Sequence, residues 1–292
     1  MPALSVVRKQ DDLHRVRVAW RARADTGVVD SVGAILGIEG AHWLADGDPD
    51  PEEIARRLRV LYKAGFRVLA LTHRFHNGLG HSSEGCPSAD DGLSPIGEMV
   101  VDEAVKAHWT IDIAHASART AEEILDRVDG PVVMSHGGPQ GHCRRYHKDN
   151  PDDQEACSID RGVSDELLRR VARQGGVIGI GFWPEAVGRG SDNIVRAIEY
   201  TIDTLSEDPT IADPCRHVAF GSDFDGAVAV PFDVAGLPDL TARLRSRVGR
   251  SAAARCFTDD RLPGLAGDNV YDLFARTLPT HAQMRAVLAG RN

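Results

Sequence analysis

The stretch Ile111-Asp112-Ile113-Ala114-His115 carries the pattern on which the fold depends: a short apolar run that ends in an ionisable side chain. Such runs predict strands, and a nearly continuous apolar character is typical of strands covered on both faces. Similar runs recur along the chain, with helical periodicity between them. Strands that alternate with helices in this way predict a parallel α/β fold. The predicted strands are 32–38, 67–72, 109–114, 131–135, 176–182 and 217–222.

The predicted helices carry clear start and stop signals. Asp50-Pro51-Glu52-Glu53 supplies an N-cap, a proline at the first helical position and a glutamate at the third, and Gly65 ends this helix. Long polar loops are predicted at 74–93 and 137–160, and no internal repeat or linker is visible, so residues 1–292 form one predicted domain. Further helices are predicted from Asp11 to about Arg23, from Ser94 to about His108, after Ser164, and over 194–205 and 270–278.

Composition narrows the functional classes. The chain has 292 residues and a formal net charge of -9, and it has no basic stripe that would indicate a nucleic-acid partner. No window reaches the roughly 18–20 apolar residues of a membrane span, and no signal peptide is recognisable. An odd number of cysteines, five, then predicts reduced thiols and a cytoplasmic location. Cys143 and Cys157 flank a polar loop, and we do not expect them to pair.

Five of the six predicted strands lead directly into an ionisable residue. In a parallel barrel the carboxyl ends of the strands meet at one mouth, where catalytic groups lie. Each residue alone is readily explained as a turn cap or as part of a structural ion pair. Together, at one rim, they favour a functional site. The five residues are Glu39, His73, His115, His136 and Asp223.

The residue types indicate metal chemistry. Two neutral imidazoles and a carboxylate, drawn from these five residues, suit Zn²⁺ or a similar divalent ion. Asp223 is predicted to lie close by, as a further ligand or as a group that moves a proton. A bound zinc ion lowers the pKa of water toward about 7 and polarises a carbonyl group. These effects predict hydrolysis of an amide or an ester.

Seven short segments, in order over residues 30–278, resemble those of the membrane dipeptidase (renal dipeptidase) family. Any one segment is weak evidence, whereas seven in the family's order are specific. The segments are Gly37-Ile38-Glu39-Gly40-Ala41-His42, Leu69-Ala70-Leu71-Thr72-His73, Gly92-Leu93-Ser94-Pro95-Ile96-Gly97, Ile111-Asp112-Ile113-Ala114-His115-Ala116-Ser117, Pro131-Val132-Val133-Met134-Ser135-His136, Arg161-Gly162-Val163-Ser164-Asp165-Glu166 and Gly221-Ser222-Asp223-Phe224-Asp225-Gly226.

The resemblance implies a TIM-type (β/α) barrel that carries two zinc ions and cleaves the peptide bond of small dipeptides with metal-activated water. It implies that Glu39 bridges the two metals and that His115 and His136 complete one metal site. It also places Asp223 beside the other metal, where it would handle the catalytic proton.

The resemblance assigns two further residues to the substrate. His73 would orient it, and Arg161 would hold its carboxylate with the forked donors of a guanidinium group. Substrate choice depends on the loops at 74–93 and 137–160, so hydrolysis of another amide or of a lactone is an alternative. A catalytically impaired relative that binds a ligand or a partner chain is the other alternative.

The chain departs from the family at its first metal-binding segment. The family's H-x-D pair has no counterpart, because His14 is followed by Arg15 and Val16 in a helix-like stretch. Six strands are recognisable where a closed barrel has eight. We therefore expect a barrel incomplete at the N-terminus, one zinc ion rather than two, and low or no dipeptidase activity. Residues 3–7 can supply one short edge strand, and the remaining open edges predict a homodimer whose interface includes the N-terminal region.

Overall fold

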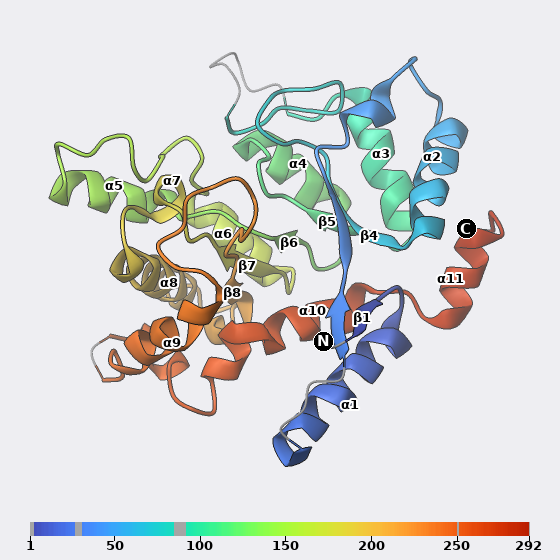
Figure 1. Ribbon diagram of the computed structural model, residues 1–292. Helices are drawn as coiled ribbons and strands as arrows, with labels where there is room; N and C mark the ends of the chain where they lie inside the picture. Colours follow the sequence, from blue (N-terminus) through green and yellow to red (C-terminus); the bar gives the residue numbers. More distant parts are fainter. Residues whose placement is uncertain (1–2, 27–30, 85–91, 250, 292) are drawn as a thin grey trace.

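The computed structural model describes residues 3–26, 31–84, 92–249 and 251–291. Its centre is a sheet of six parallel strands, in which each strand pairs with the next one along the chain (Figure 1). This order confirms the predicted parallel α/β fold. The strands are β3 (Leu36–Glu39), β4 (Phe66–Ala70), β5 (Thr110–Asp112), β6 (Val133–Met134), β7 (Val177–Ile180) and β8 (Val218–Phe220).

The sheet is an open barrel wall, since no strand in the described parts of the chain joins β3 to β8. Helices α2, α3, α4, α6 and α8 pack against one another in chain order on its outer side (Figure 1). The helices are α1 (Gln10–Thr26), α2 (Pro51–Ala64), α3 (Pro95–Lys106), α4 (Ala118–Arg127), α5 (Gln140–Asp149), α6 (Asp165–Arg173), α7 (Pro184–Val187), α8 (Ser191–Ser206), α9 (Leu237–Arg245), α10 (Asn269–Thr277) and α11 (His281–Leu288).

The predicted caps set the helix ends. In α2 the Asp50 carboxylate accepts a hydrogen bond from the amide of Glu53 at 2.9 Å, which satisfies a free donor of the first turn. Gly65 ends the helix with a φ of 113°, a left-handed conformation that costs other residues energy. Ser94 and Ser164 cap α3 and α6 in the same way. These capping residues therefore set where α2, α3 and α6 begin and where α2 ends, directly before β4.

The two faces of the sheet are covered differently. Leu69 and Ile178 are fully buried in the main core, which lies between the sheet and the outer helices. Val133 and Val177 belong to a second core, in which α10 packs through Phe274 against the inner face of the sheet. The chain therefore covers with its own helix a part of the inner face that an incomplete barrel would expose.

Residues 3–26 and 31–34, which we call the N-terminal unit, contain a separate two-stranded sheet, and their Val7 and Leu13 pack into the second core. Strand β1 (Ala3–Val6) pairs in parallel with β2 (Ser31–Ala34), which confirms the short strand predicted over residues 3–7. The strand predicted over 32–38 is in fact two strands in two sheets, divided at Ile35, because its first half pairs with β1 and its second half with β4. A side chain on Gly33 would lie 2.9 Å from Val16 of α1, so glycine permits the close packing of helix and sheet here.

Two disulfides correct the prediction of reduced thiols. Cys143 bonds Cys157, and Cys215 bonds Cys256. The first bridge holds α5 against the segment that follows it, so the region predicted as a loop at 137–160 contains a helix. Spacing could not predict either pair, because tertiary packing brings the sulfurs together. Cys86 lies outside the described residues.

No described helix is both long and apolar enough to cross a membrane.

Asp112 joins the ends of two neighbouring strands. It is the last residue of β5, and its Oδ1 accepts hydrogen bonds from the amides of Ala114 and Ser135, both at 3.0 Å. Burial raises the pKa of the Asp112 carboxyl, and these hydrogen bonds oppose that rise. One buried carboxylate thus fixes the backbone turns that carry His115 and His136.

Replacing Asp112 should destabilise the fold. Asp112→Ala leaves two amides without their acceptor, which we expect to lower the free energy of unfolding by about 2–4 kcal/mol. Asp112→Asn keeps an acceptor oxygen and should lose less than half as much. Urea denaturation of the three proteins measures both values. An alanine variant as stable as the parent protein would show that the two turns hold without Asp112.

The disulfides give a second prediction. The Cys215–Cys256 bridge closes a loop of 41 residues, and its replacement by a pair of alanines should lower the free energy of unfolding by about 2–4 kcal/mol. In the parent protein, thiol labelling in denaturant without reductant should leave the four cysteines of the two disulfides unmodified. Labelling of all four would contradict the pairing. Thermal unfolding of the double variant then measures the contribution of the bridge.

Candidate metal centre and substrate site

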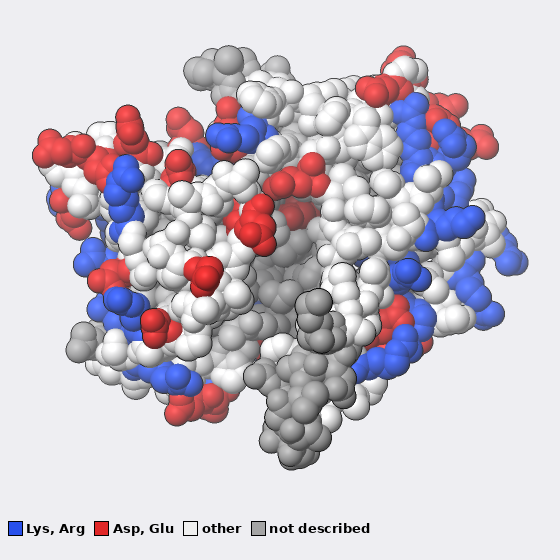
Figure 2. All heavy atoms as spheres, viewed as in Figure 1, with Lys and Arg blue, Asp and Glu red and all other residues white. Residues whose placement is uncertain are grey.

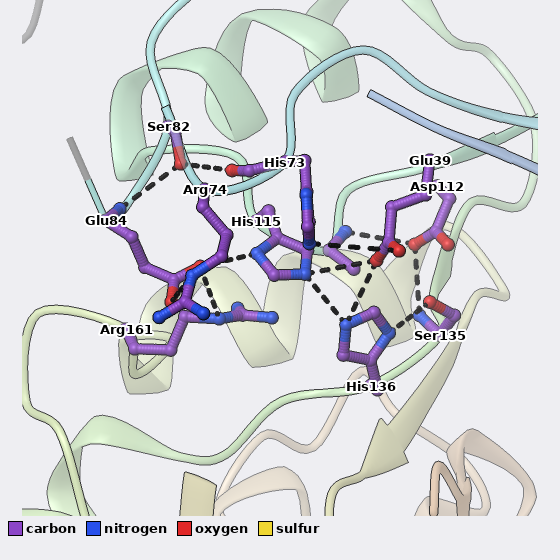
Figure 3. A network of polar contacts seen from close by, with 11 residues as sticks. Glu39, His73, Arg74, Ser82, Glu84, Asp112, His115, Ser135, His136 and Arg161 are labelled. Atoms are coloured by element: carbon purple, nitrogen blue, oxygen red, sulfur yellow. Dashed lines mark hydrogen bonds and ion pairs between the residues drawn. The ribbon is translucent and has the colours of Figure 1, made fainter. Parts of the chain in front are cut away.

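Three ligand atoms meet at the carboxyl ends of the strands (Figure 3). Oε1 of Glu39 lies 3.1 Å from Nε2 of His115 and 3.4 Å from Nε2 of His136. The two Nε2 atoms are 2.9 Å apart. The three residues follow or end β3, β5 and β6, so the pairing of these strands brings together groups that are far apart in the sequence.

The spacing of these atoms suits a metal ion. A tetrahedral zinc ion with Zn–N and Zn–O distances of about 2.0–2.1 Å separates its ligand atoms by roughly 3.3 Å. The three separations found, 2.9, 3.1 and 3.4 Å, lie around that value. Glu39 and His115 also form a triad with His73 whose ligand atoms lie within 4.8 Å of one another. The group that includes His136 is tighter and lies closer to the separations between ligand atoms of a bound zinc ion.

The outer nitrogens of the two imidazoles are also held. Glu84 Oε2 lies 2.6 Å from Nδ1 of His115, and a carboxylate can only accept, so Nδ1 carries the proton. Nε2 of a neutral His115 then presents its lone pair to the centre. Ser135 Oγ lies 2.9 Å from Nδ1 of His136. The two Nε2 atoms and Glu39 Oε1 all carry lone pairs, and at these separations they repel one another unless a cation or a proton lies between them.

The electrostatics favour ligands without protons at two of the three positions. The hydrogen bond with His115, together with the charges of the neighbouring histidines, lowers the pKa of Glu39 to about 2, although burial opposes this. Burial and the Arg161 charge lower the pKa of His136 to about 4. For His115, burial lowers the pKa, but the carboxylates of Glu39 and Glu84 outweigh it and raise the pKa.

His73 and Asp223 lie at the same rim but farther from the centre. Nε2 of His73 is 3.9 Å from Oε2 of Glu39, and the side chain is half-exposed. Asp223 lines a cavity of about 420 Å³ together with Glu39 and His136, and burial and the charge of Glu39 raise its pKa. Figure 2 shows this face of the molecule hollowed near its middle, with acidic side chains beside the hollow. His115 and Asp223 have φ of 62° and 57°, strained values that are common at functional sites.

Arg161 borders a second cavity on the other side of His115. This cavity has a volume of about 600 Å³, and its wall includes Glu84. The Arg161 side chain is only 4% exposed, and its Nε lies 3.4 Å from Oε2 of Glu84. Nη2 has no hydrogen-bond partner among the described residues. A buried guanidinium group with a free donor can bind an anionic group of a ligand.

The structure thus brings together all the residues predicted from the strand ends and places Arg161 beside them. Three residues that support the site were not predicted: Glu84, Asp112 and Ser135. Asp112 and Ser135 stand within the strand-end segments, which was their only sequence signal. Glu84 lies inside the long polar loop at 74–93, where nothing distinguishes it from the other polar residues.

Comparison with known proteins gives curated relatives over most of the chain. An uncharacterised dipeptidase of Schizosaccharomyces pombe is 28% identical over 249 residues, which are 84% of this chain and 53% of that protein. The dipeptidase aclJ of Aspergillus oryzae is 28% identical over 82% of this chain and 50% of its own. An uncharacterised protein of Klebsiella pneumoniae is 30% identical over 70% of this chain and 72% of its own length. The chain spans about half the length of the first two relatives.

Solved structures share the fold. A metallo peptidase from Rhodobacter sphaeroides, liganded with a phosphinate mimic of the dipeptide L-Ala-D-Ala, superposes with a TM-score of 0.68 at 21% identity, over 94% of this chain and 69% of that one. The probable dipeptidase PvdM from Pseudomonas aeruginosa superposes with a TM-score of 0.70 at 18% identity, over 94% of this chain and 74% of that one. A sequence model of the membrane dipeptidase family (peptidase family M19) matches residues 3–284. With that match over nearly its whole length, the chain belongs to the membrane dipeptidase family.

Proposed function

We propose that this protein is a zinc-dependent dipeptidase. The observation that carries the proposal is the convergence of Glu39 Oε1 with Nε2 of His115 and of His136 at 2.9–3.4 Å. Membership of the dipeptidase family and the phosphinate dipeptide mimic bound by the Rhodobacter sphaeroides relative support a dipeptide as substrate. Three protein ligands leave an open position, as in catalytic zinc sites.

In this mechanism the chain's own residues bind the substrate and move the proton. When bound, the zinc ion supplies a Lewis acid that polarises the scissile carbonyl and lowers the pKa of the attacking water. Arg161 is placed to hold the substrate carboxylate, and half-exposed His73 to donate a hydrogen bond at the rim. Asp223, whose pKa is raised, is suited to accept a proton from water and return it to the leaving amine.

We also propose one zinc ion per chain and a homodimer. One tight ligand group supports a single ion. The N-terminal unit exposes large apolar side chains: Leu4 of β1 is 72% exposed and Val32 of β2, its partner in the register, 43%. Trp20 of α1 is 55% exposed. Apolar groups gathered in one small unit favour a protein contact.

The cytoplasmic location predicted from the sequence depends on the cysteines being reduced. The two disulfides weigh against it, because thiols in a reducing compartment seldom remain paired. We propose instead that the protein works in an oxidising compartment. Trapping the thiols with an alkylating reagent at the moment of cell lysis would test this, and finding all of them reduced would restore the cytoplasmic prediction.

His115→Ala tests the metal and the activity together. We expect zinc content to fall from about one ion per chain to less than a tenth of that, because one of three ligands is lost, and dipeptide hydrolysis to fall with it. His281→Ala, an exposed histidine on α11, is the matched control and should change neither. Elemental analysis and release of free amino acids are the measurements. An unchanged zinc content in the His115→Ala variant would show that His115 is not a metal ligand.

Leu4→Glu tests the dimer. A charge in the centre of the proposed contact should shift the protein from dimer to monomer in sedimentation equilibrium at micromolar concentration. Val234→Glu serves as the control, since Val234 is 68% exposed and lies in the short helical turn before α9, outside the N-terminal segments. A parent protein that sediments as a monomer would contradict the proposed dimer.

A further inference from the structure

We propose that Glu84 is a positioning residue that couples the metal ligand His115 to the substrate-binding Arg161. The inference rests on the proposed function for the role of Arg161, but its link to the metal stands on geometry alone. A single carboxylate oxygen, Oε2, contacts both partners: Nδ1 of His115 at 2.6 Å and Nε of Arg161 at 3.4 Å. Its other oxygen lies 3.8 Å from Nε of Arg74 (Figure 3).

Glu84 sets the state of His115. By accepting a hydrogen bond from Nδ1–H it selects the tautomer whose Nε2 is free to bind a metal, and it also fixes the plane of the ring. A carboxylate on the outer nitrogen makes the imidazole a stronger ligand. Since His115 is 8% exposed, no solvent molecule can easily replace this partner.

Glu84 also stabilises Arg161. A guanidinium group that is 4% exposed needs a nearby negative charge, because an unpaired buried cation is strongly destabilising. The contact with Glu84 uses Nε, and the neighbouring Nη2 has no hydrogen-bond partner among the described residues, so its donors are left for a ligand. One carboxylate therefore orients the metal ligand and the anion-binding fork relative to each other.

The backbone around Glu84 is anchored to both histidine-bearing turns. The Ser82 hydroxyl donates a hydrogen bond to the carbonyl oxygen of His73, and the Ser83 amide donates one to the carbonyl oxygen of His115 at 2.9 Å. The Glu84 amide donates to Ser82 Oγ at 3.2 Å. Residues 82–84 thus bridge the ends of β4 and β5, and the carboxylate does not depend on a free-swinging loop for its place.

The test uses Glu84→Ala and Glu84→Gln in the full chain. Zinc affinity, measured by competition with a chromophoric chelator, should fall about 10–100-fold in Glu84→Ala, the usual effect of losing such a partner. Glu84→Gln keeps an acceptor for His115 without the charge and should recover most of the zinc affinity. It should still show a raised KM for dipeptides with little change in kcat, because Arg161 loses its counter-charge.

The matched control is Glu166→Gln, an exposed carboxylate on α6 that pairs with Arg173 and is not among the residues lining the Arg161 cavity. It should leave zinc affinity, KM and thermal stability unchanged. A Glu84→Gln variant with parental zinc affinity and parental KM overturns the proposal, as does a Glu84→Ala variant that folds and binds zinc like the parent protein. If the parent chain binds zinc but hydrolyses no dipeptide, the proposed activity fails while the zinc result for Glu84 still decides its role.

Discussion

The parallel pairing of β3 to β8 is the constraint on which the site depends. Parallel strands point their carboxyl ends to the same edge, and each helix returns the chain to begin the next strand at the opposite edge. A ligand group placed just after a strand therefore meets the groups that follow its neighbours. Glu39, His115 and His136 converge for this reason, although long helices separate them in the chain. The Asp112 carboxylate then fixes the two turns in which the histidines lie.

Buried charge at this edge is closely balanced. The imidazoles of His115 and His136 face one carboxylate at the centre, while Glu84 and Arg161 form a second layer behind His115. In such a site each charge is tolerated because a partner compensates its loss of hydration. A cation at the centre, as we propose, would complete this balance.

An open sheet has to cover its inner face and its edges, and this chain does so in part by itself. Helix α10 packs against the inner face through Phe274, and the disulfide between Cys215 and Cys256 holds together the segments on either side of β8 and α9. The N-terminal unit extends the strand that carries Glu39 beyond the main sheet. Its exposed apolar side chains, Leu4 and Val32 among them, are where we place a second copy.

Local signals in the sequence determined the strands of the main sheet, their order, several of the helices and the candidate ligands at the strand ends. Asp50 begins a helix and Gly65 ends it through contacts within the helix itself, and a buried parallel strand needs an apolar run. Helix ends and buried strands can therefore be recognised without tertiary information. Only the tertiary structure decided the contribution of Glu84, the pairing of the cysteines and the division of the first predicted strand at Ile35. Each of these depends on which distant segment lies alongside, and a polar residue in a loop or a lone thiol carries no periodicity that names its partner.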